Sequence, residues 1–199
     1  MAWHQSLKKW SQSSYGIIHA LAIAGDIQMG NLSSIGSNVA KSMTWLSSHI
    51  GFPSVIQDKG YRPNSIKLDN RSAEEVIVWL RRSVAEMLIV DLASLCDELL
   101  QDIMTTKGIP FSGTRYFIQR VTLISVWPNE EWAKTAMLEL NALRNCIIHS
   151  DSRWNEQNAK EIEGIHGVKP LVGEAIEIGF REVINFKRAV RVFLGAASR

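Results

Sequence analysis

The longest helical repeat in the chain lies between Ser72 and Pro110, and it limits what the chain can fold into. Ser72 followed by Glu75 is a capping box, in which the two side chains satisfy free N–H groups at a helix start. Apolar side chains then recur every three or four residues, at Ala73, Ile77, Leu80, Val84, Leu88, Leu92, Leu95, Leu99 and Ile103. Gly108 and Pro110 should end the helix near Thr106. Roughly 34 helical residues span about 50 Å at 1.5 Å per residue, a length typical of the backbone of a helical bundle.

The rest of the chain is also helical in pattern, and no convincing alternating stretch indicates a strand. Further helices are expected over Ser6–Ile27, Ser34–Ile50, Ser112–Val126, Asn129–His149 and Glu174–Gly195. A linker is expected over residues 51–70 and a long polar loop over residues 150–173. We therefore predict an all-α, up-and-down helical bundle with one very long helix. Residues 1–70 would form an N-terminal helical extension and linker, and residues 71–199 the bundle itself.

Composition and charge are those of a soluble globular protein. The 199 residues are 46% hydrophobic and 21% charged. The formal net charge of +2 is too small to indicate nucleic-acid binding by itself, so any nucleic-acid surface would have to be a local patch. Cys96 and Cys146 lie on expected helices without a disulfide framework, which favours a reducing cytoplasm. No stretch approaches the roughly 20 apolar residues of a membrane span, so no membrane association is expected.

Two motifs contain possible ligands but lack the pattern that such sites need. Residues 36–42 imitate a phosphate-binding loop, but Ala40 stands where that motif needs its second glycine, and no strand precedes it. His149, Asp151 and His166 could supply metal ligands, but His-x-Asp spacing does not share a helix face. A metal-dependent hydrolase using these three residues is kept as a third hypothesis. Our prediction includes no metal and no cofactor.

The last expected helix carries a basic stripe. Arg181, Arg188 and Arg191 lie within about a quarter turn of one another at 100° per residue. Such stripes are most often solvated faces. If an active site lies nearby, these arginines are the candidates for contact with RNA phosphates.

The expected helix Asn129–His149 has two unusual faces. One carries apolar side chains, namely Ala136, Leu140, Leu143 and Ile147. The opposite face carries Lys134, Asn141, Asn145 and His149 beside apolar neighbours. A solvent face would be richer in Lys and Glu, so burial is expected on both sides, and a second subunit is the simplest cover for the second face. Buried asparagines and a histidine need partners, which suggests a catalytic pocket.

The sequence Arg144-Asn145-x-x-x-His149, at the end of a late helix, resembles the signature of the HEPN superfamily (higher eukaryotes and prokaryotes nucleotide-binding). That signature is an arginine, four to six residues, and a histidine, commonly with a polar residue after the arginine. The resemblance covers about residues 72–195. It implies a metal-independent endoribonuclease, active as a homodimer with a composite active site, in a toxin–antitoxin or antiviral system. Ile147 stands where some members carry a tyrosine that receives AMP, so this form of control is not expected.

The residue types suit RNA cleavage. His149 can act as a general base on the ribose 2′-OH or as an acid to the leaving 5′-oxygen. Arg144 can hold the scissile phosphate, and Asn145 can bind the phosphate or orient the histidine. The expected products carry a 2′,3′-cyclic phosphate and a 5′-hydroxyl. Two alternatives stay open: a non-catalytic helical module that binds a protein or RNA, and a helix end at which Arg144 lies on the surface and His149 is a C-terminal cap.

Overall fold

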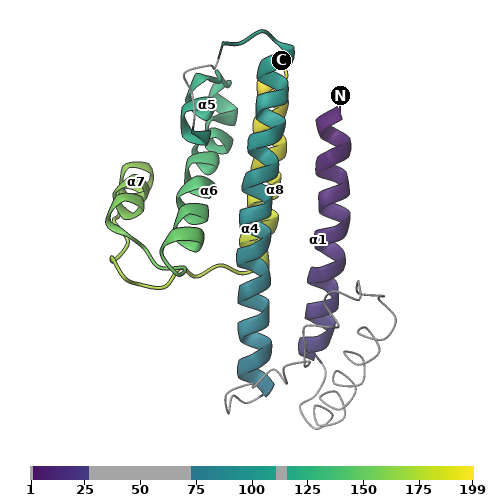
Figure 1. Cartoon of the computed structure of the whole chain (residues 1–199), viewed down its shortest axis with the longest axis vertical. Coiled ribbons are helices and arrows are strands. Elements are labelled where there is room, and N and C mark those ends of the chain that lie inside the picture. Colours follow the sequence, from purple (N-terminus) through teal and green to yellow (C-terminus); the bar gives the residue numbers. More distant parts are fainter. Residues whose placement is uncertain (1, 27–72, 111–115) are drawn as a thin grey trace, which may run out of the picture. The chain divides into compact units, whose positions relative to one another are not determined.

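The computed structural model describes residues 2–26, 73–110 and 116–199 (Figure 1). Within these ranges the chain is helical and has no strand, which confirms the predicted all-α class. The α-helices are α1 (Ala2–Asp26), α4 (Ala73–Thr106), α5 (Phe117–Leu123), α6 (Glu131–His149), α7 (Glu156–His166) and α8 (Phe180–Ala197), with a 3-10 helix, η2 (Pro128–Glu130), before α6. The expected helix Ser34–Ile50, the linker over residues 51–70 and the loop-like residues 36–42 lie outside the described ranges. No helix in the described part is long and apolar enough to cross a membrane.

The chain divides into two compact units. One contains residues 1–18 and 81–199, and the other contains residues 19–80. This division differs from the expected boundary at residue 70, because the start of α1 packs with the C-terminal bundle. Trp10 Nε1 of α1 donates to Asp91 Oδ2 of α4 at 2.6 Å, and Trp3 and Leu7 are buried in the bundle core.

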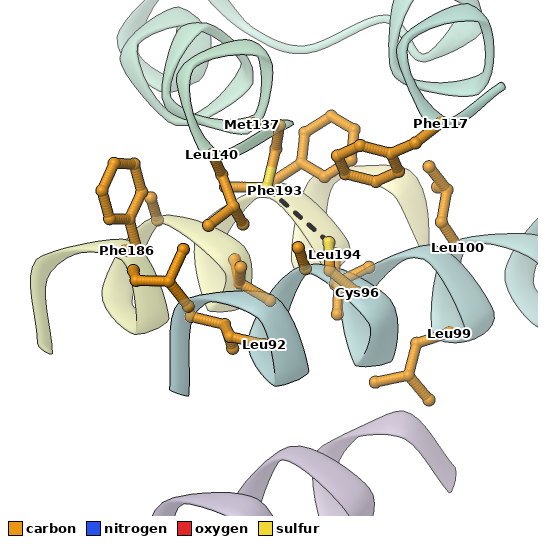
Figure 2. Close-up of a cluster of buried hydrophobic side chains, with 14 of the residues drawn as sticks. Leu92, Cys96, Leu99, Leu100, Phe117, Met137, Leu140, Phe186, Phe193 and Leu194 are labelled. Atoms are coloured by element: carbon orange, nitrogen blue, oxygen red, sulfur yellow. Dashed lines mark hydrogen bonds between the residues drawn. The ribbon is translucent and has the colours of Figure 1, made fainter. Parts of the chain in front are cut away.

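The core of the unit lies where α4, α6 and α8 meet (Figure 2). Its fully buried side chains include Leu92 and Leu100 from α4, Met137 and Leu140 from α6, and Phe193 from α8. Burial of each such side chain stabilises the fold by about 1.5–3 kcal/mol.

A thiol also lies in this core. The Cys96 thiol contacts the Met137 sulfur at 3.7 Å, the dashed line in Figure 2. Burial raises the pKa of Cys96 far above the usual range of a thiol, so this residue stays an uncharged part of the core.

The buried side of α6 is broader than the predicted stripe. Leu140 and Leu143 are buried as expected, whereas Ala136 and Ile147 are only half-buried. Met137 and Cys146 are fully buried in their place. The reason is that α6 packs against α5, α7 and α8 together, and no single apolar stripe can satisfy three neighbours.

The prediction of a loop over residues 150–173 is wrong, because α7 lies within these residues. The Asn155 side chain caps this helix by accepting a hydrogen bond from the Asn158 backbone N–H at 2.9 Å. Gly167 ends it in the left-handed conformation at φ 72°, where a side chain would be strained. Both signals are present in the sequence, at the spacing of a three-turn helix.

The last helix begins later than expected, at Phe180 rather than Glu174. Residues 174–176 are extended and pair with the chain that leaves α6: Trp154 N–H donates to Glu174 O at 3.0 Å, and Ile176 N–H donates to Ser152 O at 2.9 Å. Ile176 and Ile178 are buried on alternate positions, which is the period of an extended segment. Glu182 then accepts from the Gly179 N–H at 2.9 Å and starts α8.

Candidate active site

A groove of about 910 Å³ opens between α4, α5, α6 and α7. Arg144, Asn145 and His149 of α6 all line it, together with Asn141. The other lining side chains include Asp97 and Glu98 of α4, Tyr116 and Arg120 beside and on α5, and Asn155, Asn158 and Glu161 before and on α7. In Figure 1, α6 lies between α7 and α4.

The second face of α6 is therefore covered in part by the same chain. Lys134 Nζ donates to the carbonyl oxygens of Ile124 at 2.8 Å and Thr122 at 3.3 Å, which satisfies the C-terminal end of α5. Asn141 is buried, and Asn145 and His149 reach the groove. A second subunit is not needed to explain these polar side chains, in contrast to the sequence argument.

Arg144 and His149 of one chain contribute to one groove, although their spacing on an ideal helix separates them by about 140°. The groove is wide enough to include both positions because its lining comes from four helices. This arrangement removes the geometric reason for a composite site built by two chains.

Asn145 orients Arg144. The Arg144 Nη1 donates to Asn145 Oδ1 at 3.3 Å, and both side chains are half-buried. The sequence suggested that Asn145 binds phosphate or orients the histidine, whereas the contact seen is with the guanidinium. Among the described residues, Arg144 forms no ion pair with a carboxylate, so its charge is available to an anionic ligand.

The α6 helix ends at His149, as predicted, and a tight turn fixes this end. The N–H groups of Ser150 and Ser152 both donate to Cys146 O, at 3.0 and 3.2 Å. Asp151 and Ser152 adopt the left-handed conformation at φ 50° and 54°. Such non-glycine residues cost about 1–3 kcal/mol each and occur preferentially at functional sites. His149 precedes this turn and is exposed.

The other arginine of the groove is already neutralised. Arg120 is buried, and its Nε and Nη2 donate to Asp97 at 2.8 Å and 2.6 Å. Nη2 also lies 2.6 Å from the second carboxylate oxygen of Asp97. Glu98 and Glu161 keep the α4 and α7 sides of the groove acidic.

The sequence did not predict the residues that line the α7 side of the groove. Burial raises the pKa of the Cys146 thiol, and hydrogen bonds from the Asn155 backbone and the Asn158 side chain oppose this shift without cancelling it. Cys146 is therefore a protonated, buried thiol that helps to hold α7 against α6. The cap at Asn155 and the glycine at residue 167 were the signals that could have placed these side chains.

The remaining candidates lie outside the groove. Arg181, Arg188 and Arg191 are exposed on α8 and do not line it. His166 pairs with Glu139, Nε2 to Oε2 at 3.5 Å. In the described part of the chain no three His, Cys, Asp or Glu side chains gather closely enough to hold a metal ion, so His149, Asp151 and His166 do not form the alternative metal site.

Comparison of the chain with protein-family models, curated proteins and solved structures finds no match in any of the three. The resemblance to HEPN proteins therefore rests on Arg144-Asn145-x-x-x-His149 and on the order of the helices.

Proposed function

We propose that the chain is a metal-independent endoribonuclease of HEPN type that cleaves RNA at the groove. The observation that carries the proposal is that Arg144, Asn145 and His149 line one cavity of about 910 Å³. Cavities of roughly 300–1,000 Å³ hold small organic ligands, so a nucleotide segment fits here.

The proposed chemistry uses the ribose 2′-OH as the nucleophile. His149 removes the 2′-OH proton, the 2′-oxygen attacks phosphorus, and the bond from phosphorus to the 5′-oxygen breaks. The departing 5′-oxygen takes a proton from the imidazolium. The products are a 2′,3′-cyclic phosphate and a 5′-hydroxyl, and no oxidant or metal enters the balance.

Arg144 stabilises the charge that develops on the phosphate. A guanidinium can donate two parallel hydrogen bonds to phosphate oxygens, and the contact from Asn145 limits its rotation. Glu98 and Glu161 repel phosphate from the sides of the groove. The scissile phosphate is therefore placed at Arg144.

The resemblance extends the proposal to partners. A homodimer and a toxin–antitoxin or antiviral role, with an antitoxin or other defence partner, are proposed on that basis. The proposed interface includes Ile148 on the second face of α6, a large apolar side chain that is 44% exposed.

The test is RNA cleavage in excess EDTA. Purified wild-type protein, His149→Ala and Arg144→Ala are incubated with mixed RNA, and the new ends are identified. We expect cyclic phosphate ends from the wild type and a rate about 10²–10⁴-fold lower in each variant, the range that acid–base groups supply. His166→Ala is the matched control, because His166 also ends a helix but does not line the groove.

Each other outcome has a clear meaning. Cleavage that requires added divalent metal contradicts the proposal. RNA binding without cleavage under any condition favours the non-catalytic module. Circular dichroism of each variant confirms that the helices are intact.

A further inference from the structure

The charges of the groove limit how it can bind RNA. In the described part of the chain its lining contains two arginines and no lysine, and one of these arginines, Arg120, is bound to Asp97. Glu98 is exposed on the same lining and repels phosphate. A groove that follows the RNA backbone needs a row of cations, because each phosphate contact adds to the affinity. Arg144 is left to hold one phosphate, so further affinity has to come from contacts with the bases.

A tyrosine on the lining of the groove is open to solvent. Tyr116 is 69% exposed, whereas its neighbour Phe117, which also lines the groove, is 8% exposed and packs in the core. An exposed aromatic ring presents a flat face, and unpaired RNA bases stack on such faces. Stacking accepts every base, because each base has a π-face. Tyr116 therefore has the chemistry of a platform for one base.

The backbone that carries Tyr116 is held in place. Tyr116 N–H donates to Gln119 Oε1 at 3.3 Å, and Tyr116 O accepts from the N–H groups of Gln119 at 3.1 Å and Arg120 at 3.3 Å. Phe117 is buried in the core, and Arg120 is bound to Asp97. The ring is thus presented from a fixed point, which reduces the conformational entropy lost when a base stacks on it.

We propose that Tyr116 stacks on a base of the RNA segment whose phosphate is held by Arg144. This inference rests on the proposed ribonuclease function, since the phosphate at Arg144 places the RNA in the groove. A base reaches Tyr116 only when it is unpaired, because neighbouring bases cover its faces within a duplex. The groove therefore selects an unpaired nucleotide without selecting its base. Tyr116 touches no reacting atom, so it contributes to substrate binding and not to the chemical step.

Binding is measured apart from cleavage. Short single-stranded RNA is titrated with proteins that all carry His149→Ala, so that the RNA is not cleaved. Adding Tyr116→Ala should weaken binding by about 5- to 150-fold, the effect of losing one base–aromatic stack. Tyr116→Phe keeps the ring and should bind like the parent protein. Trp132→Ala is the matched control, because Trp132 is 48% exposed on α6 but does not line the groove.

Dinucleotides identify the stacked base. A dinucleotide without terminal phosphates has a single phosphate, which fixes its register at Arg144. Removal of the base on one side of this phosphate should abolish the difference between Tyr116→Ala and its parent, because the stack is already lost. Removal of the base on the other side should leave the difference intact. A difference that persists whichever base is removed would overturn the stacking site.

Cleavage is measured with His149 intact. Tyr116→Ala should raise KM for single-stranded RNA and leave kcat near the wild-type value, since the stack is the same in the bound substrate and in the transition state. Selective loss of RNA binding in Tyr116→Ala, without any cleavage by the wild type, would support the stacking site and contradict the nuclease.

Three results would overturn the stacking site and leave the nuclease standing. The first is RNA cleavage with binding and KM unchanged in Tyr116→Ala. The second is cleavage with equal losses of binding in Tyr116→Ala and Trp132→Ala. The third is cleavage with equal losses in Tyr116→Ala and Tyr116→Phe, which would assign the effect to the hydroxyl group instead of the ring. Circular dichroism of each variant verifies that the helices are intact.

Discussion

At the scale of single residues, the two arginines that line the groove have different roles. Arg120 is buried and bound to Asp97 through three short contacts, whereas Arg144 is half-buried and donates to the amide oxygen of Asn145. A guanidinium that already faces a carboxylate contributes to stability, and one without a charged partner can receive a phosphate. The sequence alone treats both residues as helical arginines.

The Asp97–Arg120 pair should matter for stability. In Asp97→Ala, the buried guanidinium loses the carboxylate that compensates its charge, and the free energy of unfolding should fall by about 3 kcal/mol. Urea unfolding followed by tryptophan fluorescence measures this change. Glu86→Ala is the control, because it removes a more exposed i,i+4 pair with Arg82 and should cost under about 0.5 kcal/mol. Equal losses in the two variants would show that burial of the pair has no effect.

At the scale of elements, α6 and α7 together make the site. The two-sided character of α6 was visible in the sequence, and its end at His149 was predicted. The sequence did not predict that α7 covers the second face of α6, because residues 150–173 have the pattern of a polar loop. The α7 helix has only a few buried side chains, namely Asn158, Ala159 and Ile162, so its apolar period is weak and its end signals carry more information.

The role of the α8 arginines can be tested at this scale. If Arg181, Arg188 and Arg191 contact RNA phosphates, replacing all three with alanine should reduce the dependence of log affinity on log salt by about 2, at roughly 0.7 per contact for single strands. Fluorescence anisotropy at several salt concentrations measures the slope, with His149→Ala present in every protein compared so that the RNA is not cleaved. Lys107→Ala is the control for an exposed cation at another site. An unchanged slope would mean that the stripe is a solvated face.

At the scale of the whole molecule, the first unit combines the start of α1 with the chain from Arg81, within α4, onward. Trp3, Leu7 and Trp10 contribute to the same core as the bundle, so the first residues are part of the unit that carries the groove. A truncation at residue 70 would remove them from that core.

The oligomeric state can be tested with two matched substitutions. We expect a homodimer by analytical ultracentrifugation, and Ile148→Glu should shift it to monomer because a charge cannot be buried in the interface without a partner. Ile184→Glu is the control, since Ile184 is 42% exposed on α8 and Ile148 is 44% exposed on α6. The monomeric variant should retain RNA cleavage, because Arg144 and His149 line the groove of one chain. A wild-type monomer would contradict the proposed dimer.

The sequence by itself determined the all-α class, the end of α6 at His149, and the presence of polar side chains on its second face. These features depend on local periodicity and capping, which act within one helix. Only the tertiary structure decided that α5 and α7 cover that face, that Asp97 neutralises Arg120, and that Arg144 and His149 share one groove. Helical spacing fixes the direction of a side chain around its own axis. The groove depends on which other helices pack beside that axis, and this is set by long-range contacts.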